Sequence, residues 1–203
     1  YTDSEEKIGL ALSDVRKDII ISTKSPAKDK KTLLEQVQMS LERMKTDYID
    51  ILQLHNPDVL PDPEDPDSTY GGLLEAKKKG WVRHIGITNH SLARAVAAVK
   101  SGKYETIQYP FSSLATDEEV ELTRLAKQED VGFIAMKGLS GGLITNAATT
   151  FSFIKQYDNV VPIWGIQRES ELLEFIEMEK NPPAYDDAMK ALIEKDRREL
   201  AGN

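Results

Sequence analysis

Asp47-Tyr48-Ile49-Asp50-Ile51-Leu52-Gln53-Leu54-His55-Asn56-Pro57 is the stretch from which the fold of this chain can be inferred. Its run from Tyr48 to Leu54 is apolar or β-favouring and lies between a helix-like segment and a proline-rich loop, which predicts a buried parallel strand. His55 then stands at the carboxyl end of that strand. In an alternating α/β chain, ligands bind and catalytic side chains collect at this edge.

Predicted strands and helices alternate along the rest of the chain. A capping box at Asp3 or Ser4 predicts a short first helix, Ser91 is expected to cap a later helix, and Thr116 with Glu119 forms a second capping box. Residues 56–68 carry four prolines and are expected to form a long surface loop. Strands are expected at 18–23, 48–54, 82–87, 105–107, 131–136 and 160–164, and helices at 31–45, 69–79, 116–128 and 149–156, with two more after residue 168.

Six strands that alternate with helices predict a parallel sheet with right-handed crossovers. A (β/α)8 barrel needs eight such units and about 250 residues, so the pattern suggests a TIM barrel of the α/β class whose first two strands precede Tyr1. A six-stranded doubly wound sheet is the alternative. No Gly-x-Gly-x-x-Gly turn follows any strand, which weighs modestly against that alternative.

The composition is that of an ordinary globular domain. The 203 residues are 40% hydrophobic and 30% charged, and no apolar run approaches the roughly 18 residues that a membrane span needs. No signal peptide is visible, so a cytoplasmic location is expected. The absence of cysteine and the presence of only three histidines disfavour a metal site, and a net charge of −8 disfavours nucleic acid as a partner.

Polar side chains follow the predicted strands at the point where each strand ends. Lys24, His55, Asn89, Gln108 and Lys137 hold these positions, and a glycine-containing run follows the last of them at 138–143. Taken singly, each has an ordinary interpretation, such as a solvated lysine or a histidine in a turn. Taken together at one edge, they predict a polar, partly cationic pocket.

These residues stand in motifs that resemble the aldo/keto reductase family over essentially the whole chain. The motifs are Tyr-x-x-Ser-Glu-Glu at residues 1–6, Ser-Thr-Lys-Ser at 22–25, Asp-Ile-Leu-Gln-Leu-His at 50–55, and Gly-Trp-Val-Arg-His-Ile-Gly-Ile-Thr-Asn at 80–89. The wording at 55–58, 135–142 and 162–172 is similar to a bacterial subset that often continues into a ferredoxin-like tail with 4Fe-4S clusters. The resemblance therefore implies a reductase barrel at 1–181, incomplete at its N-terminus, and a C-terminal helix at 182–203 packed on it, where such a tail would follow.

The resemblance implies reversible hydride transfer between NADP(H) and a small carbonyl substrate. Tyr1 would be the general acid, Lys24 would lower the pKa of its phenol, and His55 would orient the carbonyl. A catalytic aspartate of the family would precede Tyr1. The residues matching the family's cofactor site are Thr88, Asn89, Gln108, Met136, Lys137, Gly138, Leu139, Gly141, Leu143, Gly165, Gln167, Arg168 and Glu171.

Two positions in the cofactor region depart from the family pattern. Met136 stands where many relatives have a tyrosine beneath the nicotinamide, and Phe175 replaces a frequent asparagine near the adenine. Two other functions stay open at this point. Lys24 could form a Schiff base in a lyase, or the chain could be a non-catalytic nicotinamide-binding module that senses redox state.

Overall fold

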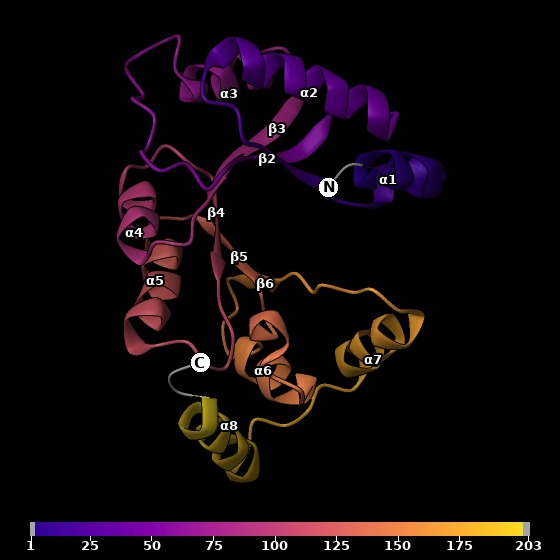
Figure 1. Cartoon of the computed structure of the whole chain (residues 1–203), viewed down its shortest axis with the longest axis vertical. Helices are drawn as coiled ribbons and strands as arrows, with labels where there is room; N and C mark the ends of the chain where they lie inside the picture. Colours follow the sequence, from indigo (N-terminus) through magenta and orange to yellow (C-terminus); the bar gives the residue numbers. More distant parts are fainter. Residues whose placement is uncertain (1–2, 201–203) are drawn as a thin grey trace. The chain divides into compact units, whose positions relative to one another are not determined.

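The computed structural model describes residues 3–200, and the chain divides into two compact units that adjoin at Ile107 and Gln108 (Figure 1). Its strands follow one another in the sheet order β1-β2-β3-β4-β5-β6, and the pairs β1–β2, β2–β3 and β5–β6 are parallel. This order confirms the predicted α/β class. It also disfavours the doubly wound alternative, because in such sheets the strand order reverses at a switch point.

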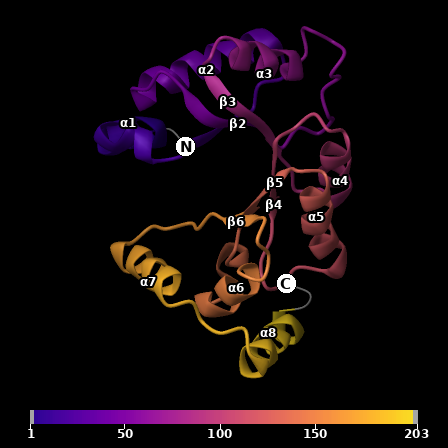
Figure 2. The ribbon, with the colours of Figure 1, turned by 180° about the vertical axis from the view of Figure 1, so that it is seen from behind.

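The first unit contains three parallel strands with helices on one face. Figures 1 and 2 show α2 and α3 side by side over β2 and β3. Its core consists of apolar side chains from the strands and from these helices, including Leu33, Leu52, Leu73 and Ile87. The elements are α1 (Ser4–Leu12), the 3-10 helix η1 (Ser13–Asp18), β1 (Ser22–Ser25), α2 (Lys30–Met44), β2 (Ile49–His55), α3 (Thr69–Lys78), β3 (Val82–Thr88) and α4 (Leu92–Lys100).

The second unit has an aromatic core. Phe111 lies 5.5 Å from Phe133 and from Phe153, and 5.3 Å from Tyr157, measured between ring centroids. The last helix, α8, is tied to this unit by Arg197, whose guanidinium donates to the Ser113 and Ala115 carbonyls. The elements are α5 (Asp117–Gln128), β5 (Gly132–Met136), the 3-10 helix η2 (Ser140–Gly142), α6 (Ala147–Ile154), β6 (Val160–Pro162), α7 (Glu169–Lys180) and α8 (Asp187–Leu200), while β4 (Thr106–Pro110) crosses the boundary between units.

Two of the predicted helix caps are present as hydrogen bonds. The Ser91 hydroxyl accepts from the Arg94 amide, and Thr116 and Glu119 form the predicted capping box at the start of α5. The predicted cap at Asp3 or Ser4 is wrong: no side-chain cap bond forms there, and the Asp3 carboxylate instead pairs with Lys7 at 2.8 Å.

Several predicted boundaries are also wrong by a few residues. The strand predicted from residue 18 begins at Ser22, because Ser13–Asp18 form a 3-10 helix and Ile20 is 78% exposed. The strand predicted to residue 164 ends at Pro162, and the helix predicted at 149–156 covers Ala147–Ile154. Within residues 3–200, no helix is long and apolar enough to cross a membrane.

Candidate active site

The strand register of the first unit places four polar side chains on one face of its strands. Lys24 of β1 lies opposite Gln53 of β2, and His55 of β2 lies opposite Thr88 of β3. Residues paired in register point to the same face, and residues two apart on a strand do so as well. Lys24, Gln53, His55 and Thr88 therefore share a face, and two of them, Lys24 and His55, are residues that the sequence predicted at the ends of their strands.

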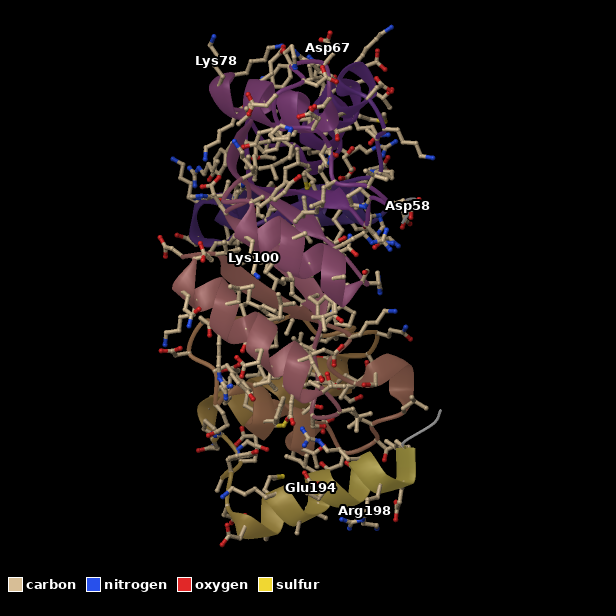
Figure 3. The ribbon with its side chains drawn as sticks, turned by 90° about the vertical axis from the view of Figure 1, so that its left-hand side faces the viewer. Asp58, Asp67, Lys78, Lys100, Glu194 and Arg198 are labelled. Atoms are coloured by element: carbon tan, nitrogen blue, oxygen red, sulfur yellow. The ribbon has the colours of Figure 1, made fainter. Side chains whose placement is uncertain are left out.

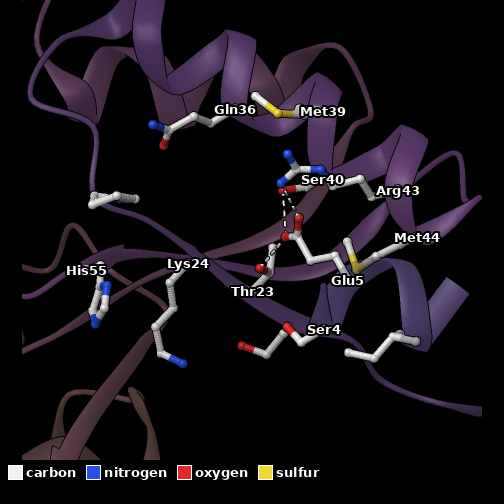
Figure 4. Close-up of a pocket in the computed structure, with 13 residues that line it drawn as sticks. Ser4, Glu5, Thr23, Lys24, Gln36, Met39, Ser40, Arg43, Met44 and His55 are labelled. Atoms are coloured by element: carbon white, nitrogen blue, oxygen red, sulfur yellow. Dashed lines mark hydrogen bonds and ion pairs between the residues drawn. The ribbon is translucent and has the colours of Figure 1, made fainter. Parts of the chain in front are cut away.

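Lys24 and His55 line a pocket of about 520 Å³ in the first unit. Figure 4 shows both side chains at one end of this pocket, and side chains from α1 and α2 at the other. The strand residues bring ammonium and imidazole groups, while Ile8, Met39 and Met44 make part of the wall apolar. A cationic end with an apolar wall suits a small polar group on a carbon skeleton.

The surroundings of Lys24 and His55 lower the pKa of both groups. Burial lowers the pKa of Lys24. Burial also lowers the pKa of His55, and the nearby positive charges of Lys24 and His90 lower it further. Both effects disfavour the imidazolium, so His55 is a neutral hydrogen-bonding group at pH 7.

Thr88 and Asn89 are buried and hydrogen-bonded where β3 ends. The Asn56 amide donates to the Thr88 carbonyl and hydroxyl oxygens at 3.1 and 3.0 Å. The Asn89 side chain is fully buried, donates to the Pro57 carbonyl at 3.3 Å, and accepts from the Ser91 amide at 2.8 Å. Asn89 thus joins two loops at the strand end, which gives its amide a fixed orientation.

The predicted proton donor, Tyr1, lies outside the described residues. It precedes Ser4, the first residue of α1, by three positions. Ser4, Glu5 and Ile8 of α1 line the pocket that holds Lys24 and His55. The catalytic role of Tyr1 stays a prediction.

Gln108 and Met136 lie together in the second unit. The Gln108 side-chain amide donates to the Met136 sulfur at 3.3 Å, and both residues are buried. The Met136 thioether sulfur is therefore a weak hydrogen-bond acceptor for the Gln108 side-chain amide. Lys137 follows Met136 with a left-handed φ of 56° and an exposed side chain.

A second pocket, of about 540 Å³, is formed by two loops of the second unit. Gly141 and Gly142 have φ of 72° and 98°, and no atom lies within 4 Å of the position a Cβ would take on either. Such a loop leaves its backbone open to a close ligand, which is the property phosphate-binding turns use. The predicted residues that line this pocket are Lys137, Gly138, Leu139, Gly141, Gly165, Gln167 and Glu171, whereas Leu143 and Arg168 are not among its lining residues.

Glu171 holds the N-terminus of α7 through its own carboxylate. That carboxylate accepts from the Gln167 and Arg168 amides at 2.8 and 3.2 Å, and from the Arg168 guanidinium at 2.7 and 2.9 Å. The Gln167 amide and the Arg168 guanidinium lower the pKa of Glu171. Arg168 is 77% exposed, so its guanidinium also faces solvent beside the second pocket.

The sequence did not predict an aromatic stack that supports the second pocket. Trp164 stacks on Phe175 with ring centroids 4.4 Å apart and lies 6.1 Å from Phe151 on planes 17° apart. A Cβ on Gly138 would lie 2.4 Å from the Trp164 ring, so glycine permits this close approach. Phe175, only 7% exposed, is a core residue beneath the loop. Residues 151, 164 and 175 follow no regular spacing, so no periodic signal could have found the stack.

The sequence and the fold match one family of known proteins. A profile of the Aldo/keto reductase family matches residues 1–156. The chain is 29% identical over 161 residues to aldo-keto reductase YhdN of Bacillus subtilis, covering 73% of this chain and 48% of that protein. It is 32% identical over 153 residues to methylglyoxal reductase DkgB of Escherichia coli O157:H7, covering 69% and 54%. The chain thus spans about half the length of these curated relatives.

Solved structures show the same fold. Aldo-keto reductase AKR11C1 from Bacillus halodurans superposes with a TM-score of 0.78 at 22% identity, covering 95% of this chain and 76% of that one. An aldo/keto reductase from Klebsiella pneumoniae, solved with NADP and acetate, gives 0.77 at 16% identity, covering 94% and 74%. This likeness confirms the predicted barrel-type α/β fold. By sequence and by fold, the chain belongs to the aldo/keto reductase family.

Proposed function

We propose that this protein is an NADP(H)-dependent reductase that converts a small aldehyde or ketone to an alcohol. The observation that carries the proposal is the joint placement of Lys24 and His55 in one pocket, at the ends of neighbouring parallel strands. Membership of the aldo/keto reductase family supports the same chemistry. The printed name of one relative, methylglyoxal reductase, supports a small carbonyl compound as the substrate class.

In the proposed mechanism, His55 donates a hydrogen bond to the substrate carbonyl oxygen, which its neutral imidazole can do at pH 7. NADPH, when bound, supplies the hydride for the carbonyl carbon. Tyr1 transfers its phenolic proton to the oxygen that becomes the alcohol, leaving a phenolate. The ammonium of Lys24 stabilises that phenolate, which lowers the pKa of a group otherwise near 10.

Two segments of the second pocket, at 137–142 and 163–171, present groups that suit a dinucleotide. Gly141 and Gly142 open a backbone cradle, and Lys137 adds a positive charge to the same pocket. In the proposal, this loop and residues 165–171 hold the phosphates, with Arg168 on the 2′-phosphate. Thr88, Asn89, Gln108 and Met136 would hold the nicotinamide.

The predicted iron–sulfur tail, cellular location and domain boundary also stay proposals. A 4Fe-4S tail would need its cysteine ligands from outside this sequence, which contains none. The cytoplasmic location and the boundary between residues 181 and 182 are likewise untested expectations. Neither the Schiff-base lyase nor the redox-sensing module gains support from the comparisons, which name reductases.

Steady-state oxidation of NADPH in the presence of small aldehydes and ketones, methylglyoxal included, tests the proposal. Lys24→Met and Tyr1→Phe should each lower kcat by about 10²–10⁴-fold while NADPH binding persists, because a general acid and its partner act mainly in the transition state. NADPH binding without turnover by the parent protein would favour the sensor module. A borohydride-trapped adduct on Lys24 would favour the lyase.

A further inference from the structure

Glu5, in the first turn of α1, connects three elements of the first unit. Its Oε1 accepts hydrogen bonds from the Thr23 hydroxyl of β1 at 2.8 Å and from the Ser40 hydroxyl of α2 at 2.7 Å. Its Oε2 lies 3.6 Å from the Arg43 guanidinium. The Glu5 side chain is 18% exposed, so these bonds are largely shielded from water. Hydrogen bonds to a carboxylate are stronger than those between neutral groups.

The Thr23 bond places this carboxylate one residue away from Lys24. Side chains alternate along a strand, so Thr23 points to the helix side of β1 while Lys24 points to the opposite face. Figure 4 shows Glu5 bonded to Thr23 and Ser40, with Lys24 and His55 farther along the same pocket. The bond therefore fixes the start of α1 against the strand end that carries Lys24.

We propose that Glu5 is a positioning residue, whose carboxylate holds the first turn of α1 against β1 and α2 and so keeps α1 in place as a wall of the pocket that contains Lys24. This rests on the proposed function, in which Tyr1 and Lys24 share a proton-transfer site. Releasing α1 therefore opens the surroundings of Lys24 to water and lets this pocket wall move.

A positioning role and an electrostatic role predict different effects of two substitutions. Glu5→Gln removes the charge but keeps a side-chain oxygen that can accept from Thr23 and Ser40. Glu5→Ala removes the acceptor as well. The other titratable groups that line this pocket, Lys24, Arg43 and His55, are present in both variants.

Kinetics of the whole protein give the first readout. Glu5→Ala should lower kcat for carbonyl reduction by about 10²-fold, as misplacement by 1 Å can do, with the KM for NADPH essentially unchanged. Glu5→Gln should stay close to the parent. Glu6→Ala is the matched control, since Glu6 is the exposed neighbour on the same helix turn. Equal losses in Glu5→Gln and Glu5→Ala would overturn the proposal in favour of a charge effect.

The pKa of Lys24 gives a second readout that does not need activity. It can be measured by NMR of ¹³C-methylated lysines, with the Lys24 signal assigned by its loss in Lys24→Arg. Glu5→Ala should raise this pKa toward the usual value of 10.5, because a released α1 admits water to the pocket. Loss of the negative charge alone would lower it. An unchanged pKa and an unchanged kcat together would overturn the proposal.

These two readouts separate failure of the inference from failure of the proposed function. If the parent protein reduces no carbonyl but Glu5→Ala still raises the pKa of Lys24, the anchor stands and the reductase assignment falls. If Glu5→Ala does not fold, as judged by circular dichroism, Ser40→Ala removes one of the two hydroxyl donors instead. That variant should shift kcat and the Lys24 pKa in the same directions, by smaller amounts, and no shift in either would overturn the proposal.

Discussion

Replacing Asp50 by alanine should destabilise the first unit more than any surface substitution. Asp50 lies inside the strand that ends at His55, and its side chain is 7% exposed. Its carboxylate accepts from the Ile21 amide at 3.0 Å, from Arg16 at 2.8 Å and from Arg83 at 2.9 Å. An aspartate in an apolar strand is thus explained by the partners that surround it.

The size of the effect follows from the group that the substitution leaves behind. The Arg16 side chain is only 10% exposed, so Asp50→Ala leaves its charge buried without this partner. Breaking a buried ion pair in this way costs about 3–5 kcal/mol. Asp50→Asn keeps an acceptor for the Ile21 amide and should cost less, about 1.5–3 kcal/mol for one charged hydrogen bond.

Urea unfolding followed by circular dichroism measures these free energies, and hydrogen exchange of the β2 amides locates the loss in the first unit. Asp58→Ala is the matched control, because the Asp58 side chain (labelled in Figure 3) is 94% exposed and its bridge to Arg94 is 3.5 Å long. The control should change stability by less than about 0.5 kcal/mol. Asp50→Ala with stability as close to the parent as the control would refute the reasoning.

The same interaction predicts a pH dependence. Burial raises the pKa of Asp50, but the Ile21 amide and the Arg16 guanidinium lower it by more, so the net pKa is below 3.8. A carboxyl with a lowered folded pKa adds stability that is fully present above its unfolded pKa. The advantage of the parent over Asp50→Asn should therefore hold above about pH 4 and shrink as the pH falls through the folded pKa. An advantage that grew on acidification would contradict this assignment.

Three further substitutions, one of them with a matched control, test the candidate site. Gly138→Ala should cost about 1–3 kcal/mol of stability, because its Cβ would meet the Trp164 ring at 2.4 Å, whereas Gly165→Ala, where no atom lies within 4 Å, should unfold in urea like the parent. Arg168→Ala should weaken NADPH roughly ten-fold or more in a fluorescence titration and leave NADH nearly unchanged, and equal losses would rule out the 2′-phosphate role. His55→Ala should lower kcat with cofactor affinity kept, and a normal kcat would remove His55 from the site.

The sequence predicted those features of the fold that local patterns determine. The apolar run before His55 and the caps at Ser91 and Thr116 are local signals, and the structure confirms these elements. The placement of Lys24 beside the β2 strand end also followed, because parallel strands in sequential order bring their carboxyl ends to one edge.

Such local patterns do not predict which side chains far apart in the sequence form pairs. The Arg16–Asp50 pair joins residues 34 positions apart, and nothing at either residue marks its partner. The sequence predicts too early a start for β1, because the apolar run of residues 19–21 is typical of a strand. In the structure, η1 precedes this run and Ile20 is exposed. Local apolarity alone does not tell a strand from an exposed connection.

The same difference between local patterns and long-range contacts explains which residues of the candidate site the sequence could indicate. Strand-end residues such as Lys24 and His55 come from alternation and register, which a sequence shows. The Glu5 anchor and the Trp164 stack depend on side chains that meet across elements. Arg168 was predicted from resemblance alone, and its pairing with Glu171 became visible only in three dimensions.

Transfer of deuterium from NADPH labelled at its reactive C4 position tests the reductase proposal most directly. Mass spectrometry of the alcohol formed from a small aldehyde should find one deuterium on the former carbonyl carbon. Lys24→Met, which removes the charge proposed to activate Tyr1, should form this product at least about 10²-fold more slowly while still binding NADPH. Unlabelled alcohol, or labelled alcohol formed by Lys24→Met at the parent's rate, would contradict the assignment of this pocket as a carbonyl-reducing site.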